Sequence, residues 1–139
     1  MTQVLKKSKN LQILISTKGK KDLSFLDKMF KNCNPMDYSI IVVDQSESEK
    51  DLSTISEKFD IKYYNIQANG LSNSRNFAIS KSSGAICLLC DDDVIYEKDF
   101  YEIIINSFDQ NDSDVITYYA KNDNGSLFKD YPSIINHNY

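Results

Sequence analysis

The chain has 139 residues, of which 41% are hydrophobic and 26% charged, a composition typical of one globular domain. No apolar run approaches the ~20 residues that a membrane-spanning helix needs, so we expect no transmembrane segment. The net charge of −4 disfavours nucleic acid as a partner, because binding to phosphates requires a basic face. The beginning of the chain has no apolar stretch of signal-peptide length, which predicts a cytoplasmic protein.

Short apolar segments alternate along the chain with longer segments whose apolar residues recur at helical spacing. The first kind predicts buried strands and the second predicts amphipathic helices. The Asn124-Gly125 pair is typical of a tight hairpin turn. In chain order we expect a strand at 11–17, a helix at 22–32, a strand at 39–44, a weaker helix at 48–59, a strand at 61–66, a helix at 72–82, a strand at 85–90, a helix at 97–108, a strand at 114–120 and a return strand at 126–129.

This alternation of strands and helices predicts an α/β fold of the doubly wound, Rossmann-like kind. The apolar residues of the strands are continuous rather than alternating, which indicates that helices cover both faces of a mostly parallel sheet in a three-layer α/β/α arrangement. We expect residues 1–139 to form a single domain of this kind. Ligands of such sheets bind beyond the carboxyl ends of the strands, so the residues that follow each strand are the candidates for a functional site.

The three cysteines are odd in number and accompany no export signal, which predicts reduced thiols. Cys87 and Cys90 have the C-x-x-C spacing of metal sites, but residues three apart on a strand face opposite sides. We therefore expect no zinc site at this pair, and the chain contains no second pair that would complete one.

Three consecutive carboxylates, Asp91, Asp92 and Asp93, follow the strand expected at 85–90. They repel one another at the end of a buried strand, and a divalent cation would remove that repulsion. Mg²⁺ and Mn²⁺ take oxygen ligands of this kind. The alternative is a solvated acidic turn before the next helix, where carboxylates favour the positive end of the helix dipole. The three residues alone leave both interpretations open.

Arg75 is the single arginine among 16 basic residues, and it occupies an inward position on the helix expected at 72–82. Asn69-Gly70 precede that helix, whose free N–H groups attract anions. A guanidinium can hold a phosphate through two parallel hydrogen bonds, so Arg75 is a candidate ligand of a nucleoside diphosphate with its metal. The alternative is an arginine at the edge of the apolar stripe that extends its charge into water.

Three segments resemble the characteristic blocks of family 2 glycosyltransferases in sequence, order and spacing. They are Ile40–Ser46 (IIVVDQS), Ala68–Asn76 (ANGLSNSRN) and Cys87–Asp93 (CLLCDDD), and the middle one is the most specific. The resemblance implies the GT-A fold and a nucleotide-sugar donor, with a UDP-sugar favoured. It also implies a divalent metal, Mn²⁺ or Mg²⁺, as cofactor.

The resemblance assigns one group of residues to the nucleotide. Thr17 and Asp44 match positions that hold the base, where Asp44 accepts a hydrogen bond from the imide N–H of uracil. Arg75 matches an arginine that lies by the nucleotide, and Asn69 and Gly70 belong to the same block. We therefore expect these five residues in the nucleotide-sugar site.

The acidic block is assigned in the same way. Asp92 matches the acid that contacts the ribose, and Asp93 matches the acid that reaches the metal on the diphosphate. Because the first acid of the family's block is replaced here, metal binding is left to Asp91 and Asp93. The sequence departs from the family at two places. Cys90 stands where the last block commonly begins with an acid, and Ser16–Gly19 replaces the usual Pro-Thr-Tyr-Asn, so the aromatic residue that often packs on the base is missing.

Members of the family commonly have a longer chain, whose second half supplies the acceptor site and the general base. The resemblance therefore implies that residues 1–139 are the N-terminal, donor-binding part of a longer glycosyltransferase. It further implies inverting transfer to a sugar, glycan or lipid-linked acceptor in polysaccharide or glycan biosynthesis, at the cytoplasmic face of the membrane. The alternatives are a truncated, catalytically inactive nucleotide-binding module and, from the fold pattern alone, a receiver-type domain with an acidic Mg²⁺ site.

Overall fold

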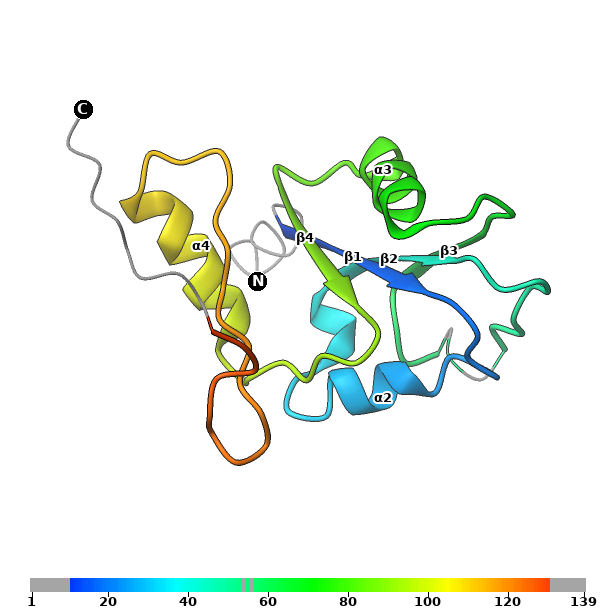
Figure 1. Cartoon of the computed structure of the whole chain (residues 1–139), viewed down its shortest axis with the longest axis horizontal. Helices are drawn as coiled ribbons and strands as arrows, with labels where there is room; N and C mark the ends of the chain where they lie inside the picture. Colours follow the sequence, from blue (N-terminus) through cyan, green and yellow to red (C-terminus); the bar gives the residue numbers. More distant parts are fainter. Residues whose placement is uncertain (1–10, 54, 56, 131–139) are drawn as a thin grey trace. The chain divides into compact units, whose positions relative to one another are not determined.

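The structure is a computed structural model that describes residues 11–53, 55 and 57–130. The chain divides into two compact units, Met1–Ile103 and Ile104–Tyr139, and α4 (Phe100–Gln110) runs across the boundary between them (Figure 1). The first unit contains a sheet and the helices that cover it. No helix in the described part of the chain is long and apolar enough to cross a membrane.

Four parallel strands form the sheet of the first unit, in the spatial order β3-β2-β1-β4. The two central strands, β1 and β2, each contain an unbroken apolar run, and nearly all of their residues are buried, as expected for strands with both faces covered. The parallel sheet predicted from the sequence is therefore confirmed. The strands are β1 (Leu11–Thr17), β2 (Ser39–Asp44), β3 (Ile61–Asn65) and β4 (Ile86–Asp91).

The register of the strands brings three carboxyl ends to one edge of the sheet. Thr17 of β1 lies beside Asp44 of β2, and Ser16 of β1 lies beside Asp91 of β4. The loops that leave these strands therefore begin side by side. This is the edge at which parallel α/β sheets bind their ligands.

One face of the sheet is covered by α3 (Leu71–Lys81), which contacts β1 and β2. Gly70 precedes the helix with φ at 95°, a backbone conformation that L side chains rarely adopt, and so allows a sharp entry into α3. Apolar side chains from the helix and the two strands form a buried cluster between them. The cluster consists of Leu14, Ile41, Val43 and Ala78.

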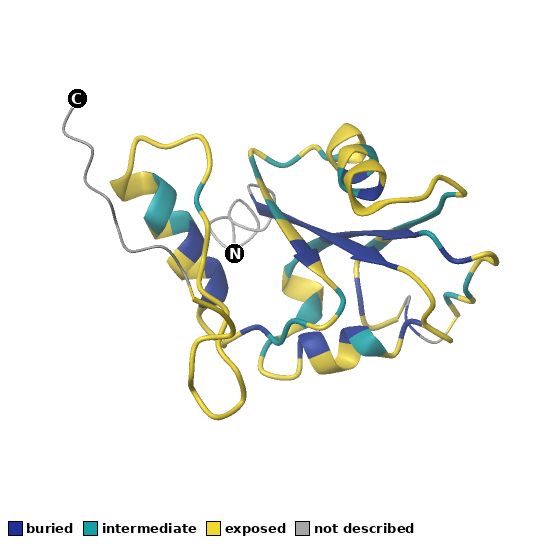
Figure 2. Ribbon diagram, viewed as in Figure 1, coloured by how far each residue is buried: buried dark blue, intermediate teal, exposed yellow. Residues whose placement is uncertain are grey.

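The opposite face of the sheet is covered by α2 (Phe25–Met29), as Figure 1 shows. Its Leu26 is completely buried, and Figure 2 shows buried positions both along the central strands and on this helix. Phe30, directly after the helix, packs edge-on against Phe59 with ring centroids 5.9 Å apart and also against Tyr96. With both faces covered, the predicted three-layer arrangement is confirmed.

The helix expected at 48–59 was wrong, because the described residues of this segment form turns. Asp51 organises one of them: its two carboxylate oxygens accept hydrogen bonds from the backbone N–H and the hydroxyl of Ser53, each 2.9 Å long. Such local bonds compete with the hydrogen bonds of a helix. The helix expected at 22–32 is also shorter than predicted, and a 3-10 turn, η1 (Pro35–Asp37), leads into β2.

The fifth strand expected at 114–120 was wrong as well, since the described residues there form no strand. Val115 is 79% exposed, and a strand is stable only when it has a sheet neighbour and a face to bury. The turn at Asn124-Gly125 does form: Gly125 has φ at 83°, and Lys121 and Leu127 make an isolated antiparallel bridge. The return strand expected at 126–129 is reduced to that bridge.

Candidate functional site

A hydrogen bond joins the carboxyl ends of β1 and β4. The hydroxyl of Thr17 donates to Oδ2 of Asp92 over 2.6 Å, and Nζ of Lys20 lies 3.7 Å from the other oxygen of that carboxylate. Thr17 is buried, while the Asp92 side chain remains 17% exposed. The structure thus brings two predicted site residues into contact and adds Lys20, which the sequence analysis did not single out.

Arg75 extends from α3 to the end of β4, where its Nη2 lies 3.2 Å from Oδ1 of Asp91. The residue before it, Ser74, is completely buried and shares a short hydrogen bond with Ser16 of β1, so the first turn of the helix lies close to the strand. Among the described residues, Nε of Arg75 has no hydrogen-bond partner. The guanidinium therefore keeps a donor that the protein does not use.

The three consecutive carboxylates separate rather than converge. Asp91 faces Arg75, Asp92 faces Thr17, and Asp93 is exposed in the turn after β4. Over the described ranges, no group of three or more acidic, cysteine or histidine side chains is arranged to hold a metal ion. Mg²⁺ needs no such group when it is bound by one or two carboxylates together with substrate phosphates. Asp91 and Asp93, both exposed, fit that mode of binding.

Cys90, directly before the acids, lies on the face of β4 opposite to that of Cys87. It is buried, and its Sγ accepts a hydrogen bond from the hydroxyl of Tyr96 over 2.8 Å. Burial raises the pKa of the Cys90 thiol to about 12, so at neutral pH it is not a thiolate and does not replace the missing acid as a ligand. Cys87 is exposed beside Ser82 of the α3 side, so the two cysteines face opposite ways, as expected for a strand.

Asp44 is completely buried at the end of β2, and both of its carboxylate oxygens have partners. Oδ1 accepts a hydrogen bond from the backbone N–H of Ser46 over 2.9 Å. Oδ2 accepts one from the hydroxyl of Tyr63 over 2.7 Å and lies 3.5 Å from Nζ of Lys50. Burial opposes ionisation, but these hydrogen bonds and the ammonium outweigh it and hold the pKa of Asp44 below its usual value. Asp44 is thus an ionised carboxylate enclosed by the protein.

The loops after β1 and β2 are joined next to Asp44. The backbone N–H of Gln45 donates to the carbonyl oxygen of Thr17 over 3.0 Å. The N–H of Gly19 donates to the hydroxyl of Ser46 over 2.9 Å. These two bonds fix the first loop against the second, which places Thr17 between the enclosed Asp44 and the acidic turn after β4.

The loop before α3 is tied to the same two loops. The side-chain amide of Gln45 donates to the carbonyl oxygen of Gly70 over 2.9 Å. Asn69 accepts a hydrogen bond from Nζ of Lys18 over 3.2 Å through its side-chain oxygen. Four loops, which follow β1, β2 and β4 and precede α3, therefore surround one polar region at the carboxyl edge of the sheet.

All residues predicted for the site lie in this region, although the structure gives Asp44 internal partners. Several residues that complete this region were not predicted from the sequence. Lysines carried no signal in a chain so rich in lysine, and Tyr63 belongs to a strand whose residues were expected to form the core. The missed residues are Lys18, Lys20, Gln45, Ser46, Lys50 and Tyr63.

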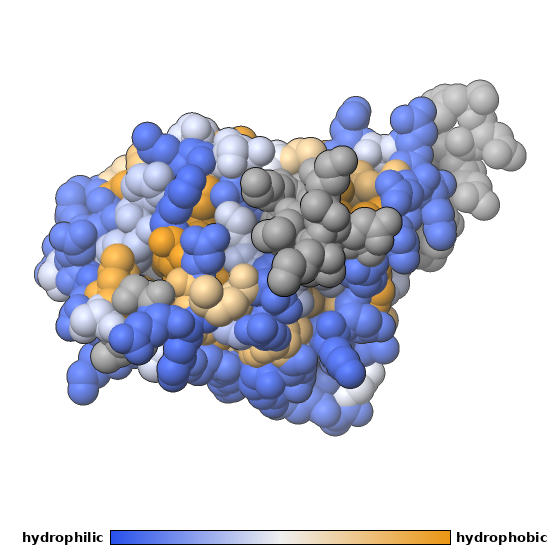
Figure 3. All heavy atoms as spheres, turned by 180° about the vertical axis from the view of Figure 1, so that it is seen from behind, coloured by the Kyte–Doolittle hydropathy of each residue, from blue (hydrophilic) through white to orange (hydrophobic). Residues whose placement is uncertain are grey.

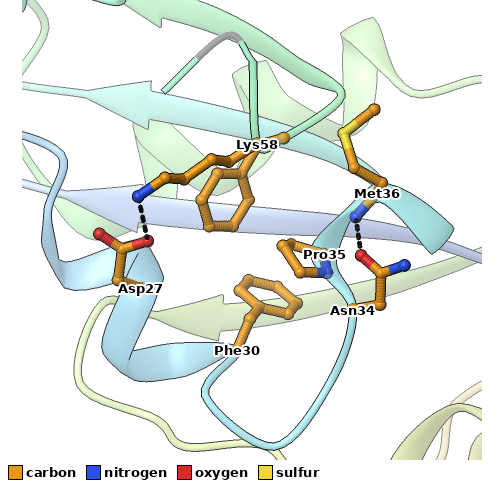
Figure 4. A pocket seen from close by; sticks show the side chains of 7 residues that line it. Asp27, Phe30, Asn34, Pro35, Met36 and Lys58 are labelled. Carbon is orange, nitrogen blue, oxygen red and sulfur yellow. Dashed lines mark hydrogen bonds and ion pairs between the residues drawn. The ribbon is translucent and has the colours of Figure 1, made fainter. Parts of the chain in front are cut away.

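A separate pocket of about 350 Å³ is lined partly by aromatic and apolar side chains (Figure 4). At its rim, Nζ of Lys58 lies 3.9 Å from a carboxylate oxygen of Asp27. None of the predicted site residues lines it, so it is not part of the candidate site. The pocket is lined by Asp27, Phe30, Asn34, Pro35, Met36, Lys58 and Phe59.

Seen from behind, the surface is mostly hydrophilic, and hydrophobic residues show in patches between polar ones (Figure 3).

The fold is that of an α/β domain, a class of proteins whose ligands bind beyond the carboxyl ends of the parallel strands. A family model described as glycosyl transferase family 2 matches residues 13–138, and the chain belongs to this family. It is therefore a glycosyltransferase domain of the Rossmann-like GT-A type. Comparison with curated proteins and with solved structures found no match.

Proposed function

We propose that this glycosyltransferase domain binds a UDP-sugar with Mn²⁺ or Mg²⁺ and takes part in inverting sugar transfer. The observation that carries the proposal is the pair of contacts Thr17–Asp92 and Arg75–Asp91 at the carboxyl edge of the sheet. They place carboxylates, a hydroxyl and a guanidinium in one region, and these groups suit the hydroxyls and phosphates of a nucleoside diphosphate sugar. Membership of the family supports a nucleotide-sugar donor.

The donor would extend from the loop after β2 to the acidic turn after β4. We place the base at the Thr17 and Asp44 end, beside the loop that contains Asn69 and Gly70. Asp92 is proposed to accept a hydrogen bond from a ribose hydroxyl, since its carboxylate is partly exposed. Arg75 would donate to the nucleotide from its partly exposed guanidinium, whose buried Nε–H has no hydrogen-bond partner among the described residues.

Asp91 and Asp93 are proposed to hold the divalent metal together with oxygens of the diphosphate. Both carboxylates are exposed, so binding of the cation would not require burial of an unpaired charge. A bound Mn²⁺ or Mg²⁺ supplies stabilisation of the negative charge on the departing diphosphate. Arg75 would then exchange part of its contact with Asp91 for the nucleotide.

The proposed reaction is a single displacement at the anomeric carbon. A hydroxyl of the sugar, glycan or lipid-linked acceptor attacks that carbon while its bond to the diphosphate oxygen breaks, and the bonding electrons leave with the diphosphate. The configuration inverts, and a general base takes the hydroxyl proton. We place the general base and the acceptor site outside residues 1–139. We place the reaction in polysaccharide or glycan biosynthesis, in the cytoplasm at the membrane face.

Titration calorimetry with UDP, CDP, ADP and GDP in the presence of Mn²⁺ tests the donor. We expect UDP to bind most tightly, and equal affinities for the four nucleotides, or no binding, would contradict the proposal. Release of UDP from UDP-sugars, measured on this chain and on any longer chain that contains it, then separates a transferase from the second candidate, a module that binds the nucleotide without transferring sugar.

A further inference from the structure

The carboxylate of Asp44 is shielded from solvent, although it stands at the proposed base end of the site. Its exposure is 0%, and its two oxygens already interact with Ser46, Tyr63 and Lys50. The imide N–H of a base could donate a hydrogen bond to this shielded carboxylate only if one of these partners moved aside. Loss of a partner would leave a buried polar group unsatisfied, which is costly.

Lys50 is a partner of this carboxylate that keeps some exposure to solvent. Its side chain is 10% exposed, whereas that of Asp44 is not exposed at all. Among the described residues the ammonium has two acceptors, Oδ2 of Asp44 at 3.5 Å and the carbonyl oxygen of Ser48 at 3.4 Å. An ammonium group has three N–H donors, so one remains for a ligand. Lys50 therefore combines a remaining donor with some exposure to solvent, whereas both oxygens of Asp44 already have partners and its side chain is not exposed.

Tyr63 fixes Lys50 in this place. Its hydroxyl accepts a hydrogen bond from the backbone N–H of Lys50 over 3.0 Å and donates its own proton to Asp44. The side chain of Asn65 adds a bond to the carbonyl oxygen of Ser46 over 3.0 Å. The loop from Ser46 to Lys50 is thus attached to β3 at both ends, which fixes the backbone from which the Lys50 side chain extends toward Asp44.

We propose that Lys50, and not Asp44, presents the hydrogen-bonding group to the base, and that Asp44 and Tyr63 position Lys50. The inference rests on the proposed nucleotide site. It reverses the polarity of recognition: a carboxylate would select the imide N–H of uracil, whereas an ammonium selects a carbonyl oxygen of the pyrimidine ring. Lys50 is then a specificity-determining residue.

The probe that separates the two polarities is UDP methylated at N3 of uracil, which lacks the imide N–H and keeps both carbonyl oxygens. Calorimetry on the wild-type chain should give affinities for UDP and N3-methyl-UDP that agree within about threefold. Loss of a hydrogen bond to a carboxylate would instead weaken binding about tenfold or more. A loss of that size overturns the proposal.

The variant that tests the donor is Lys50→Met, which keeps most of the side-chain volume and removes the charge. We expect UDP affinity to fall about tenfold or more, because a charge-assisted hydrogen bond is lost. The matched control is Lys58→Met, since Lys58 also pairs with an aspartate, Asp27 at 3.9 Å, but lines the separate pocket. Its affinity should equal that of the wild type.

Folding and function are separated by two further measurements. Lys50→Arg keeps a cationic donor, so it should recover most of the UDP affinity that Lys50→Met loses. Thermal unfolding of both variants is the control. If they unfold at the same temperature, a difference in UDP affinity reports a binding role of Lys50 and not a structural role of its charge near Asp44. Unchanged UDP affinity in Lys50→Met overturns the inference while the nucleotide site stands. Absence of UDP binding to the wild type overturns the proposed function itself.

Discussion

The hydroxyl of Thr17 and the carboxylate of Asp92 form a 2.6 Å hydrogen bond between residues 75 positions apart in the chain. The bond crosses from the end of β1 to the turn after β4. It fixes one rotamer of the acid that we assign to the ribose, and it leaves that side chain 17% exposed. Preorganisation of this kind lowers the entropy that binding would otherwise cost.

Replacement of Thr17 by valine keeps the shape of the side chain and removes the donor. We expect UDP affinity to fall about fivefold to tenfold and the free energy of unfolding to fall by about 1–2 kcal/mol, because a hydrogen bond to a charged group is lost. Calorimetry and urea unfolding measure the two effects. The control is Thr117→Val, because Thr117 is exposed and lies in the second unit. An equal effect of both variants on UDP binding would count against Thr17.

Replacement of Arg75 by lysine keeps the charge but removes the planar fork. We expect nucleotide binding to weaken by about 1–3 kcal/mol if the guanidinium makes two contacts. Without a ligand, thermal unfolding should change little, because the Asp91 contact is partly exposed and such ion pairs contribute little to stability. A change in binding below about 0.5 kcal/mol would show that Arg75 acts only as a surface residue.

Replacement of Asp93 by alanine tests the proposed metal site. We expect UDP binding in Mn²⁺ to fall to the level that the wild type shows with a chelator, and we expect a smaller effect for Asp91→Ala. The control is Asp60→Ala. Asp60 is exposed and directly precedes β3, so it lies at the amino ends of the strands, away from the proposed site at their carboxyl ends. Calorimetry with and without metal measures the difference. Equal metal dependence in Asp93→Ala and the wild type would remove Asp93 from the site.

Replacement of Asp44 by asparagine should change how stability depends on pH. The folded state holds the pKa of Asp44 below its usual value of about 3.9. The stabilisation is therefore complete above the unfolded pKa and is lost as the pH falls through the folded pKa. We expect the wild type to be the more stable protein at pH 7 and its advantage to shrink below about pH 4. Urea unfolding at both pH values measures it, and a constant difference would contradict the argument.

The sheet was predictable because its central strands are apolar on both faces and separated by recognisable helices. Asp51 and Val115 show why two elements were not. The side chain of Asp51 accepts two hydrogen bonds from Ser53, and these bonds form a turn where the spacing of apolar residues had predicted a helix. Val115 lies in a sequence suited to a strand, but the described residues provide no paired neighbour for it.

The site was predictable as a set of strand ends but not as a set of contacts. Motif residues such as Arg75 and Asp92 stand out in the sequence because their chemistry is unusual at their positions. Lys50 and Tyr63 do not, because their role depends on where a loop folds back over β3. Only the three-dimensional arrangement shows that Asp44 is enclosed and that Lys50 forms an ion pair with it.

The opposite orientation of Cys87 and Cys90 on β4 has a practical consequence for spectroscopy. Cys87 is exposed, whereas Cys90 is buried and its pKa is raised to about 12, so the two thiols differ strongly in reactivity toward maleimides. Cys33 is partly exposed, and burial raises its pKa as well. Brief labelling near neutral pH should therefore attach a fluorophore mainly at Cys87, on the strand that ends at Asp91. The native chain thus carries its own attachment point for an optical reporter of events at that strand end.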